Sequence, residues 1–483
     1  MRIFRAPAFL PFISCLAIIF IAISAWLPWR SLTWDEPHIF YQYAKNFAEG
    51  RGLVFNHDER VLGFTSPLFQ CVLAAAALFT SNLPYLGNLL FVISLAGFSI
   101  VVFLAMRRIN LGLWGFVTAI GLIIWPVPYN YMGMETLTLS FFVFTAFYFF
   151  IGGRFALAAV FVSLAVLTRF DGIIPAAILL IMYVVQEKRC PWKLFAIGAA
   201  ILIPWFVFSL LYYGAILPQT FYAKRSLLSL SGFMQQMVWK YCFSFNVIRS
   251  QELLPLPWFV LPLVGIFFGV RKSKYFALIF LYMAGIGLGY ALTGRMEEAW
   301  PLFPVMAGMR IFMFYGIYQV AALCGRLARV KRWYRPVCAA VLLFLTVPVL
   351  LHDFEILEKM PGSGYVKYFF VARMKVYEDT GTWLRKNAGP ASTVFTGEPG
   401  TLAYHSGCIF FDYYGLVTRR GWKVPLKDVG RELRADYIVL PDDYLAELGP
   451  ELPPEYEVVG VFETSPYPPV RISRRKDLAR ESS

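Results

Sequence analysis

Residues 9–38 read FLPFISCLAIIFIAISAWLPWRSLTWDEPH, an apolar run at 9–29 followed closely by the adjacent acids Asp35 and Glu36. An apolar run of this length spans the hydrocarbon of a bilayer. No small-residue cleavage site precedes Arg30, so we expect an uncleaved membrane anchor. Charges so close to lipid are costly and usually serve a function. The stretch therefore predicts a membrane protein whose chemistry begins in its first loop.

The composition fits a chain that crosses a membrane many times. Of its 483 residues 58% are hydrophobic, 18% are aromatic and 15% are charged, with a mean hydropathy of +0.59. Apolar runs of spanning length predict a polytopic α-helical membrane protein with about eleven transmembrane helices. These runs lie at 9–29, 86–106, 111–129, 136–151, 155–168, 172–186, 194–213, 255–270, 274–292, 301–322 and 335–351.

The net charge of +14 comes from short Lys and Arg clusters between apolar runs. Such clusters at alternate loops follow the positive-inside rule, and they do not form the basic stripe of a nucleic-acid-binding protein. The rule places the N-terminus in the cytoplasm. The outer side then receives the loops 30–65, 130–135, 169–171, 214–254 and 293–300 and all residues after 352.

The segment from Ser66 to Thr80 is apolar and nearly long enough to cross the membrane. Counting it as a span would put Arg107 and Arg108 outside. We therefore expect a re-entrant or juxtamembrane helix on the outer side. The alternative is a short crossing that breaks the charge rule.

The chain after residue 351 has a different composition. A mixed, helix-like stretch at 354–388 is followed by short β-like runs at 393–395, 408–411, 437–440 and 458–462, separated by Gly and Pro. This pattern predicts a transmembrane module at 1–351 and a small soluble α/β domain at 352–483, placed outside by the odd number of spans.

The first outer loop carries the strongest candidate site. Asp35-Glu36 precedes Pro37, which favours a helix start, and further polar and aromatic residues follow at near-helical spacing. One helix face would then be able to hold a sugar through His38, Tyr41, Lys45 and Asn46. The alternative is that the acids only cap an interfacial helix.

Other outer loops add charged residues at the ends of spans, including Glu297-Glu298. Arg169 and Asp171 are close in sequence, and they either take part in the site or form a local ion pair. Glu135 has no basic neighbour in sequence, so its partner must come from tertiary structure. Tyr222, Lys224 and Arg225 would hold a lipid phosphate at headgroup depth, or they form an ordinary interfacial anchor.

No nucleotide-binding, zinc-protease or serine-hydrolase motif occurs in a supporting context, and the seven Cys show no metal-ligand spacing. Hard cations prefer carboxylates, so a divalent ion (Mg, Mn or Ca) on Asp35, Glu36 or Glu135 is left open.

Together the motifs resemble the C-type (GT-C) membrane glycosyltransferases that use polyprenyl-phosphate sugars. They are most similar to the bacterial branch that contains the mycobacterial terminal arabinofuranosyltransferase. The resemblance rests on Asp35-Glu36 and on residues 43–56, 63–68, 133–136, 167–172, 218–224, 397–404 and 412–416.

The resemblance implies transfer of a sugar, arabinofuranose or another pentose or hexose, at the outer face of a bacterial inner membrane. The acceptor would be an envelope glycan, lipid or protein. Asp35 would be the general base, with Glu36 beside it and Glu135 as the second acid. Direct attack opposite the phosphate would invert the anomeric centre, with no enzyme nucleophile.

Two other functions compete with transfer. A transporter or flippase for a lipid-linked sugar would also need charges in the membrane, but transporters place them at the midplane. A non-catalytic envelope assembly factor would not explain the first loop.

Overall fold

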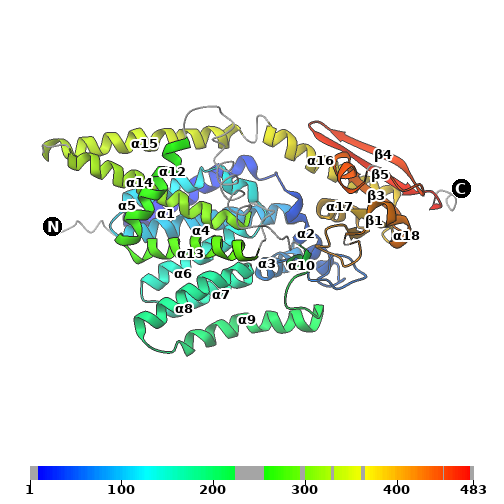
Figure 1. The fold of residues 1–483 in the computed structure, drawn as a ribbon, viewed down its shortest axis with the longest axis horizontal. Helices are drawn as coiled ribbons and strands as arrows, with labels where there is room; N and C mark the ends of the chain where they lie inside the picture. The colour runs from blue at the N-terminus through cyan, green and yellow to red at the C-terminus, as the bar shows by residue number, and fades with distance from the viewer. Residues whose placement is uncertain are drawn as a thin grey trace.

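The computed structural model describes residues 9–223, 255–293, 300–327, 331–359, 365–421, 423–449 and 451–478. A bundle of long helices and a smaller domain with a sheet lie at opposite ends of the molecule (Figure 1). The helices of the bundle are α1 (Phe9–Trp26), α4 (Leu83–Arg108), α5 (Gly112–Ile123), α6 (Thr136–Ile151), α7 (Phe155–Thr168), α8 (Ile173–Glu187), α9 (Trp192–Tyr213), α12 (Pro255–Lys272), α13 (Lys274–Thr293), α14 (Phe303–Leu327) and α15 (Lys331–Lys359).

Each of the eleven apolar runs predicted from the sequence coincides largely with one of these helices. Six helical segments are long and apolar enough to cross a membrane: 10–29, 83–108, 170–187, 192–213, 303–327 and 333–358. The other five helices do not meet both conditions over the described residues. The structure therefore supports a bundle of membrane helices but does not confirm a count of eleven spans.

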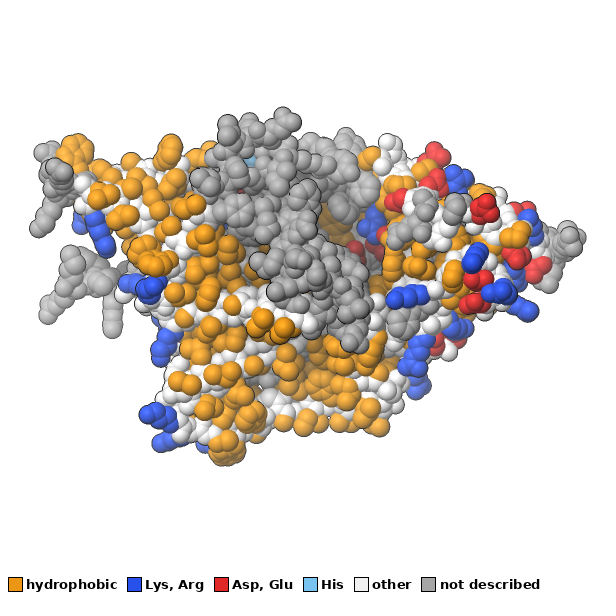
Figure 2. Space-filling model, in the orientation of Figure 1, with side chains coloured by type: hydrophobic (Ala, Val, Ile, Leu, Met, Phe, Trp, Pro, Cys, Tyr) orange, Lys and Arg blue, Asp and Glu red, His pale blue; other side chains and the backbone are white. Residues whose placement is uncertain are grey.

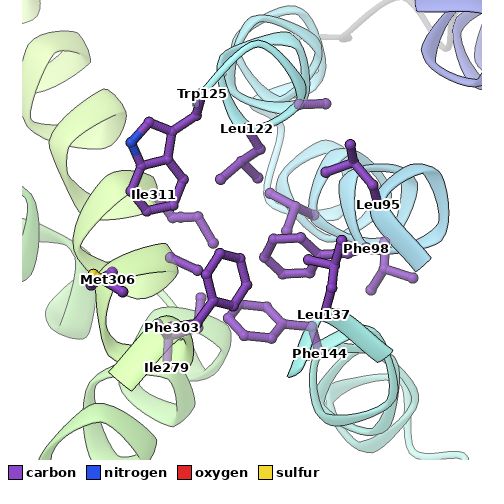
Figure 3. Packing of buried hydrophobic residues seen from close by; sticks show 14 of the residues in the cluster. Leu95, Phe98, Leu122, Trp125, Leu137, Phe144, Ile279, Phe303, Met306 and Ile311 are labelled. Carbon is purple, nitrogen blue, oxygen red and sulfur yellow. The ribbon is translucent and has the colours of Figure 1, made fainter. Parts of the chain in front are cut away.

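The centre of the bundle is packed with large apolar side chains from α4, α5, α6, α13 and α14 (Figure 3). Phe98 meets Phe144 edge to face at 4.9 Å between ring centroids, and Trp125 stacks on Phe303 at 6.0 Å. Both arrangements are favoured by the aromatic quadrupole. Close packing of this kind holds helices together where lipid replaces water around them.

The surface of the bundle is divided by charge. On the face seen in Figure 2, hydrophobic side chains cover the middle of the bundle, and Lys and Arg gather at the end far from the sheet. We call that end the basic end and the opposite one the domain end. An apolar belt bounded by charge is the surface that a bilayer requires.

Shorter elements lie between the bundle and the sheet: α2 (Asp35–Ala48), α3 (Pro67–Ala77) and α10 (Gln219–Ala223). The α3 helix falls in the apolar segment 66–80. Its 11 residues span about 16 Å, roughly half the thickness of the hydrocarbon layer. The length of α3 agrees with a juxtamembrane helix better than with a crossing.

The C-terminal part is an α/β domain, as predicted. A five-stranded sheet has the order β2-β1-β3-β5-β4, in which β1 pairs in parallel with β2 and β3. Its elements are α16 (Tyr365–Asn387), β1 (Thr393–Thr396), α17 (Pro399–Ser406), β2 (Ile409–Asp412), α18 (Val429–Glu432), β3 (Tyr437–Pro441), α19 (Asp442–Leu448), β4 (Tyr456–Thr464) and β5 (Tyr467–Arg475).

The sequence did not predict β5. It begins Tyr-Pro-Pro, and proline usually argues against a central strand. Its two prolines lie where the pairing of β4 with β5 shifts register, between the pairs Phe462–Val470 and Thr464–Tyr467. A bulge of this kind tolerates residues that cannot donate to the ladder.

One hydrophobic core joins the first loop to the C-terminal domain. It contains Phe40 and Tyr43 from α2 together with Leu402 from α17 and Phe410 from β2. Asn56 donates to the carbonyl of Phe410 at 2.8 Å and accepts from its N–H at 2.9 Å. The loop and the domain therefore pack as one unit at the domain end of the bundle.

Candidate active site

The helix α2 begins at the acid pair for local reasons. Trp34 has extended backbone angles, and the first turn holds Asp35, Glu36 and Pro37. Carboxylates at a helix N-terminus are stabilised by the helix dipole, and proline fits the first turn. Gly50, with φ of +77°, follows the end of the helix. The sequence thus fixes the acid pair at the start of α2.

The carboxylate of Asp35 contacts the start of α17. The Thr401 N–H donates to Asp35 Oδ1 at 2.8 Å, and the Asp35 side chain is buried. A Cβ atom at Gly400 would lie 2.4 Å from the backbone oxygen of Asp35, so a glycine is required there. Asp35 thus accepts from one of the N–H groups at a helix N-terminus that have no partner within the helix.

Arg373 and Glu398 complete a charged group around Asp35. Arg373 of α16 forms a two-pronged ion pair with Glu398, at 3.2 Å from Nε to Oε2 and 2.7 Å from Nη2 to Oε1. The Tyr444 hydroxyl also donates to Glu398 at 3.0 Å. We name Asp35, Glu36, Arg373 and Glu398 the junction cluster, because it lies where α2 meets the C-terminal domain.

Electrostatics couple the members of the junction cluster. Burial opposes the charge on Arg373, but the carboxylates of Glu398, Glu36 and Asp35 outweigh it and raise the Arg373 pKa above its usual value. Burial raises the pKa of Glu398, and Asp35 adds to this shift, while Arg373 opposes it. Three acids thus share one guanidinium in a nearly dry site, where charges interact strongly.

Part of the junction cluster lies in stretches that the resemblance includes. Residues 397–404 belonged to the resemblance, but Glu398 was not proposed as a site residue. Arg373 lies in a mixed helical stretch with no motif of its own. Arg373 meets the acids of α2 only through tertiary structure, because α16 begins at Tyr365 and α2 ends at Ala48.

The predicted sugar-binding face of α2 is mostly covered. His38 donates from Nδ1 to the Trp34 carbonyl at 2.6 Å, and burial lowers its pKa. Tyr41 is fully buried, and a Cβ at Gly87 would lie 2.1 Å from its hydroxyl. Asn46 donates to two carbonyls of the following loop, at 3.0 and 2.7 Å. Contacts of these residues with a sugar stay predictions.

Glu135, Arg169 and Asp171 form a second group, the Arg169 cluster, together with Tyr290. Arg169 Nη1 donates to Glu135 at 2.7 Å, and its Nε donates to Asp171 at 3.1 Å. The Tyr290 hydroxyl donates to Asp171 at 3.1 Å. The local pair Arg169–Asp171 is present, and the tertiary partner expected for Glu135 is the same arginine.

The turn before Glu135 packs on the helix that carries Asp35. Gly133, two residues before Glu135, packs on the first turns of α2, where a Cβ would lie 2.6 Å from the Tyr41 hydroxyl and 3.1 Å from Pro37. Gly133 also has a φ of +78°, so the turn suits glycine. A side chain at this position would therefore disturb the packing of the turn on α2.

The predicted phosphate-binding residues are only partly described. Tyr222 lies in α10 with 52% of its surface exposed, and α10 is held to the first loop by the Gln219 N–H, which donates to the Leu62 carbonyl at 2.7 Å. Lys224 and Arg225 lie outside the described residues, as do Glu297 and Glu298.

A third buried pair, Arg310 of α14 with Asp353 of α15, was not predicted. Arg310 also lies over the rings of Trp125 and Phe314. Asp353 falls just past the end of the last predicted span, so no pattern linked it to Arg310. Among the described residues, no group of three or more His, Cys, Asp or Glu side chains would hold a metal ion.

Comparison with known proteins identifies the fold. A family model described as a domain of unknown function (DUF8728) matches residues 368–479, which is the C-terminal domain. No curated protein matches the chain.

Solved structures match almost the whole chain. ArnT from Cupriavidus metallidurans in the apo state has a TM-score of 0.63 at 14% identity, covering 96% of this chain and 98% of that one. The same protein bound to undecaprenyl phosphate gives 0.60 at 14% identity, with 97% and 98% covered. An Archaeoglobus fulgidus oligosaccharyltransferase in complex with Zn and sulfate gives 0.60 at 13% identity, with 94% and 73% covered.

These matches show that the chain has a GT-C-like fold, as the resemblance predicted. At such low identity the likeness concerns the fold. The resemblance to the arabinofuranosyltransferase branch is not confirmed.

Proposed function

We propose that the chain is a glycosyltransferase that moves a sugar from a polyprenyl-phosphate donor to an acceptor at the outer face of the membrane. The observation that carries the proposal is the junction cluster, in which buried Asp35 lies with the partly buried residues Glu36, Arg373 and Glu398 at the domain end of a GT-C-like bundle. Its supports are the fold shared with oligosaccharyltransferase and with ArnT, which has been solved with undecaprenyl phosphate bound.

Asp35 is the base in this proposal. The acceptor hydroxyl attacks the anomeric carbon, the bond from that carbon to the phosphate oxygen breaks, and polyprenyl phosphate leaves with the electron pair. Asp35 takes the proton of the hydroxyl. The Thr401 N–H, which donates to Oδ1, fixes the carboxylate and leaves Oδ2 to receive the proton. A single displacement of this kind inverts the anomeric centre.

The other predicted residues have supporting roles in the proposal. Glu36 lies beside the base, and Glu135 acts as the second acid through the Arg169 cluster. Tyr222, Lys224 and Arg225 hold the donor phosphate. The sugar is arabinofuranose or another pentose or hexose, and the acceptor is an envelope glycan, lipid or protein of a bacterial inner membrane.

The alternative of a transporter or flippase is not favoured. The junction cluster lies beside the C-terminal domain, where α2 meets α17 (Figure 1). Transporters bind their substrates near the middle of the bilayer, between repeats.

The test is transfer of radiolabel from polyprenyl-phosphate sugars into the lipid and glycan fractions of membranes that contain the full chain. We expect Asp35→Asn to lower transfer by a factor of about 10² to 10⁴, since general-base catalysis contributes about that much. Asn keeps an oxygen for the Thr401 N–H, so the fold is preserved. Asp379→Asn, on an exposed part of α16, is the matched control and should transfer normally. Equal transfer by wild type and Asp35→Asn would refute the assignment.

A further inference from the structure

A pocket of about 500 Å³ opens beside the far end of α2, away from the acid pair. Its walls come from three parts of the chain: the last turn of α2, the turn between α3 and α4, and the helices α16 and α17. Lys45 and Arg385 supply positive charge, and Thr80 and Ser81 supply hydroxyls. The pocket thus combines cations with small polar groups.

The pocket lies at the end of a membrane helix. Leu83, one of its lining residues, is the first residue of the apolar helix α4, whose other end carries Arg107 and Arg108. Next to it Phe79 is 90% exposed, and Leu78 is also exposed. Large apolar side chains exposed this way at the end of a span are expected where they meet lipid.

The charges in the pocket favour an anion. Burial lowers the pKa of Lys45, and the neighbouring cations Arg385 and Arg51 lower it further, while Glu49 opposes them. Lys45 Nζ donates to the Tyr404 carbonyl at 2.9 Å, and Arg385 Nε donates to the His405 carbonyl at 2.5 Å. Both cations are thus held in place by α17. Glu49, the acid among the described lining residues, is paired with Arg51 at 2.8 Å.

We propose that this pocket binds the phosphate-bearing headgroup of an anionic lipid. Lys45 and Arg385 contact the phosphate, Thr80 and Ser81 bond to its oxygens or to headgroup hydroxyls, and Leu78 and Phe79 contact the acyl chains. Arg and Lys are the side chains best suited to a phosphate, because they form charge-assisted hydrogen bonds. The site is separate from the junction cluster, which lies about three helical turns away along α2.

Lys45 and Arg385 would also suit free inorganic phosphate. The exposed apolar residues Leu78 and Phe79 beside the pocket distinguish a lipid from free phosphate. Contact of the acyl chains with Phe79 increases the affinity for a lipid, whereas inorganic phosphate does not contact Phe79. The purified full chain is titrated with long-chain phosphatidylglycerol, with phosphatidylcholine and with inorganic phosphate, and lipid binding is measured by native mass spectrometry. Transfer activity is not part of this measurement, so its outcome does not depend on the proposed function.

We expect Lys45→Gln and Arg385→Gln each to weaken phosphatidylglycerol binding about tenfold, the worth of one charge-assisted hydrogen bond. Lys45→Arg should keep the affinity. Lys386→Gln is the matched control, because Lys386 shares the last turn of α16 with Arg385 but does not line the pocket. Phe79→Ser should weaken the lipid several-fold and leave phosphate unchanged. Melting temperatures verify that each variant is folded.

Three results would overturn the proposal. The first is unchanged phosphatidylglycerol affinity in both folded Gln variants, and the second is an equal loss in Lys386→Gln. The third is inorganic phosphate binding as tightly as the lipid with no effect of Phe79→Ser, which would mark a site for free anions.

Discussion

The junction cluster and the Arg169 cluster are both groups of acids around one arginine, yet they are built differently. In the Arg169 cluster, Glu135 and Asp171 each contact the guanidinium directly, and Tyr290 donates to Asp171. In the junction cluster the guanidinium of Arg373 pairs with Glu398, while Asp35 accepts from the Thr401 backbone. One arginine pairs with two acids in the first group, whereas in the second Asp35 accepts from the N–H of Thr401 at the start of α17.

This difference indicates different roles. A buried charge that is directly paired holds structure, and removing its partner is costly. A carboxylate that accepts a backbone N–H through one oxygen has a second oxygen that can receive a proton. The comparison favours catalysis at Asp35 and a positioning role for Arg169.

Arg169→Met should produce the largest loss of stability. It leaves Glu135 and Asp171 buried without their shared partner, which costs about 3 to 5 kcal/mol. We expect a sharp drop in melting temperature and in the yield of folded protein. The triple variant Arg169→Met, Glu135→Gln, Asp171→Asn removes all three charges and should recover most of the loss. A triple variant as unstable as the single one would show that the cluster does not act as a balanced group.

Gly400→Ala tests whether close packing of α17 on α2 is needed to hold Asp35. The added Cβ would lie 2.4 Å from the Asp35 backbone oxygen, so α17 must move away from α2. Overpacking of this kind costs about 1 to 3 kcal/mol. Transfer should fall more than stability does, because the Thr401 N–H no longer holds Asp35. Gly287→Ala is the control, since nothing lies within 4 Å of a Cβ there. Normal transfer by Gly400→Ala would show that catalysis by Asp35 does not depend on its contact with α17.

Much of the fold was readable from the sequence because it follows from local patterns. Apolar runs became helices, and four short β-like runs became β1, β2, β3 and β4. β5 was not predicted because it contains two prolines. The structure accommodates them where the pairing of β4 with β5 shifts register, and this shift has no local sequence pattern. The resemblance supplied the GT-C-like fold, which periodicity alone does not specify.

The site was only partly readable, for a physical reason. The spacing of α2 predicted one polar face for a sugar, but α2 is buried on most sides, because α3, α4 and α17 all pack on it. Tyr41 and Asn46 therefore pack or bind the loop backbone. Arg373 and Glu398 reach Asp35 only through the tertiary fold, and such contacts leave no local pattern.

The stability of the region around the junction should also depend on pH. Burial, together with His38, Arg385 and Lys45, lowers the pKa of His405 to about 4. The unfolded chain binds this proton near pH 6.5, so the folded state loses stability as pH falls from 6.5 towards 4. The contribution is about 2 kcal/mol over that range, discounted for partial exposure.

His405→Gln should flatten the fall in melting temperature between pH 6.5 and 4. Glu398 acts in the opposite sense, because its raised pKa means that the folded state gains stability as pH falls through its titration. Glu398→Gln should therefore steepen the acid loss. If both variants follow the wild-type profile, burial at the junction does not shift the pKa of either His405 or Glu398. If only His405→Gln departs from it, the pH response belongs to α17 rather than to the acids that α17 contacts.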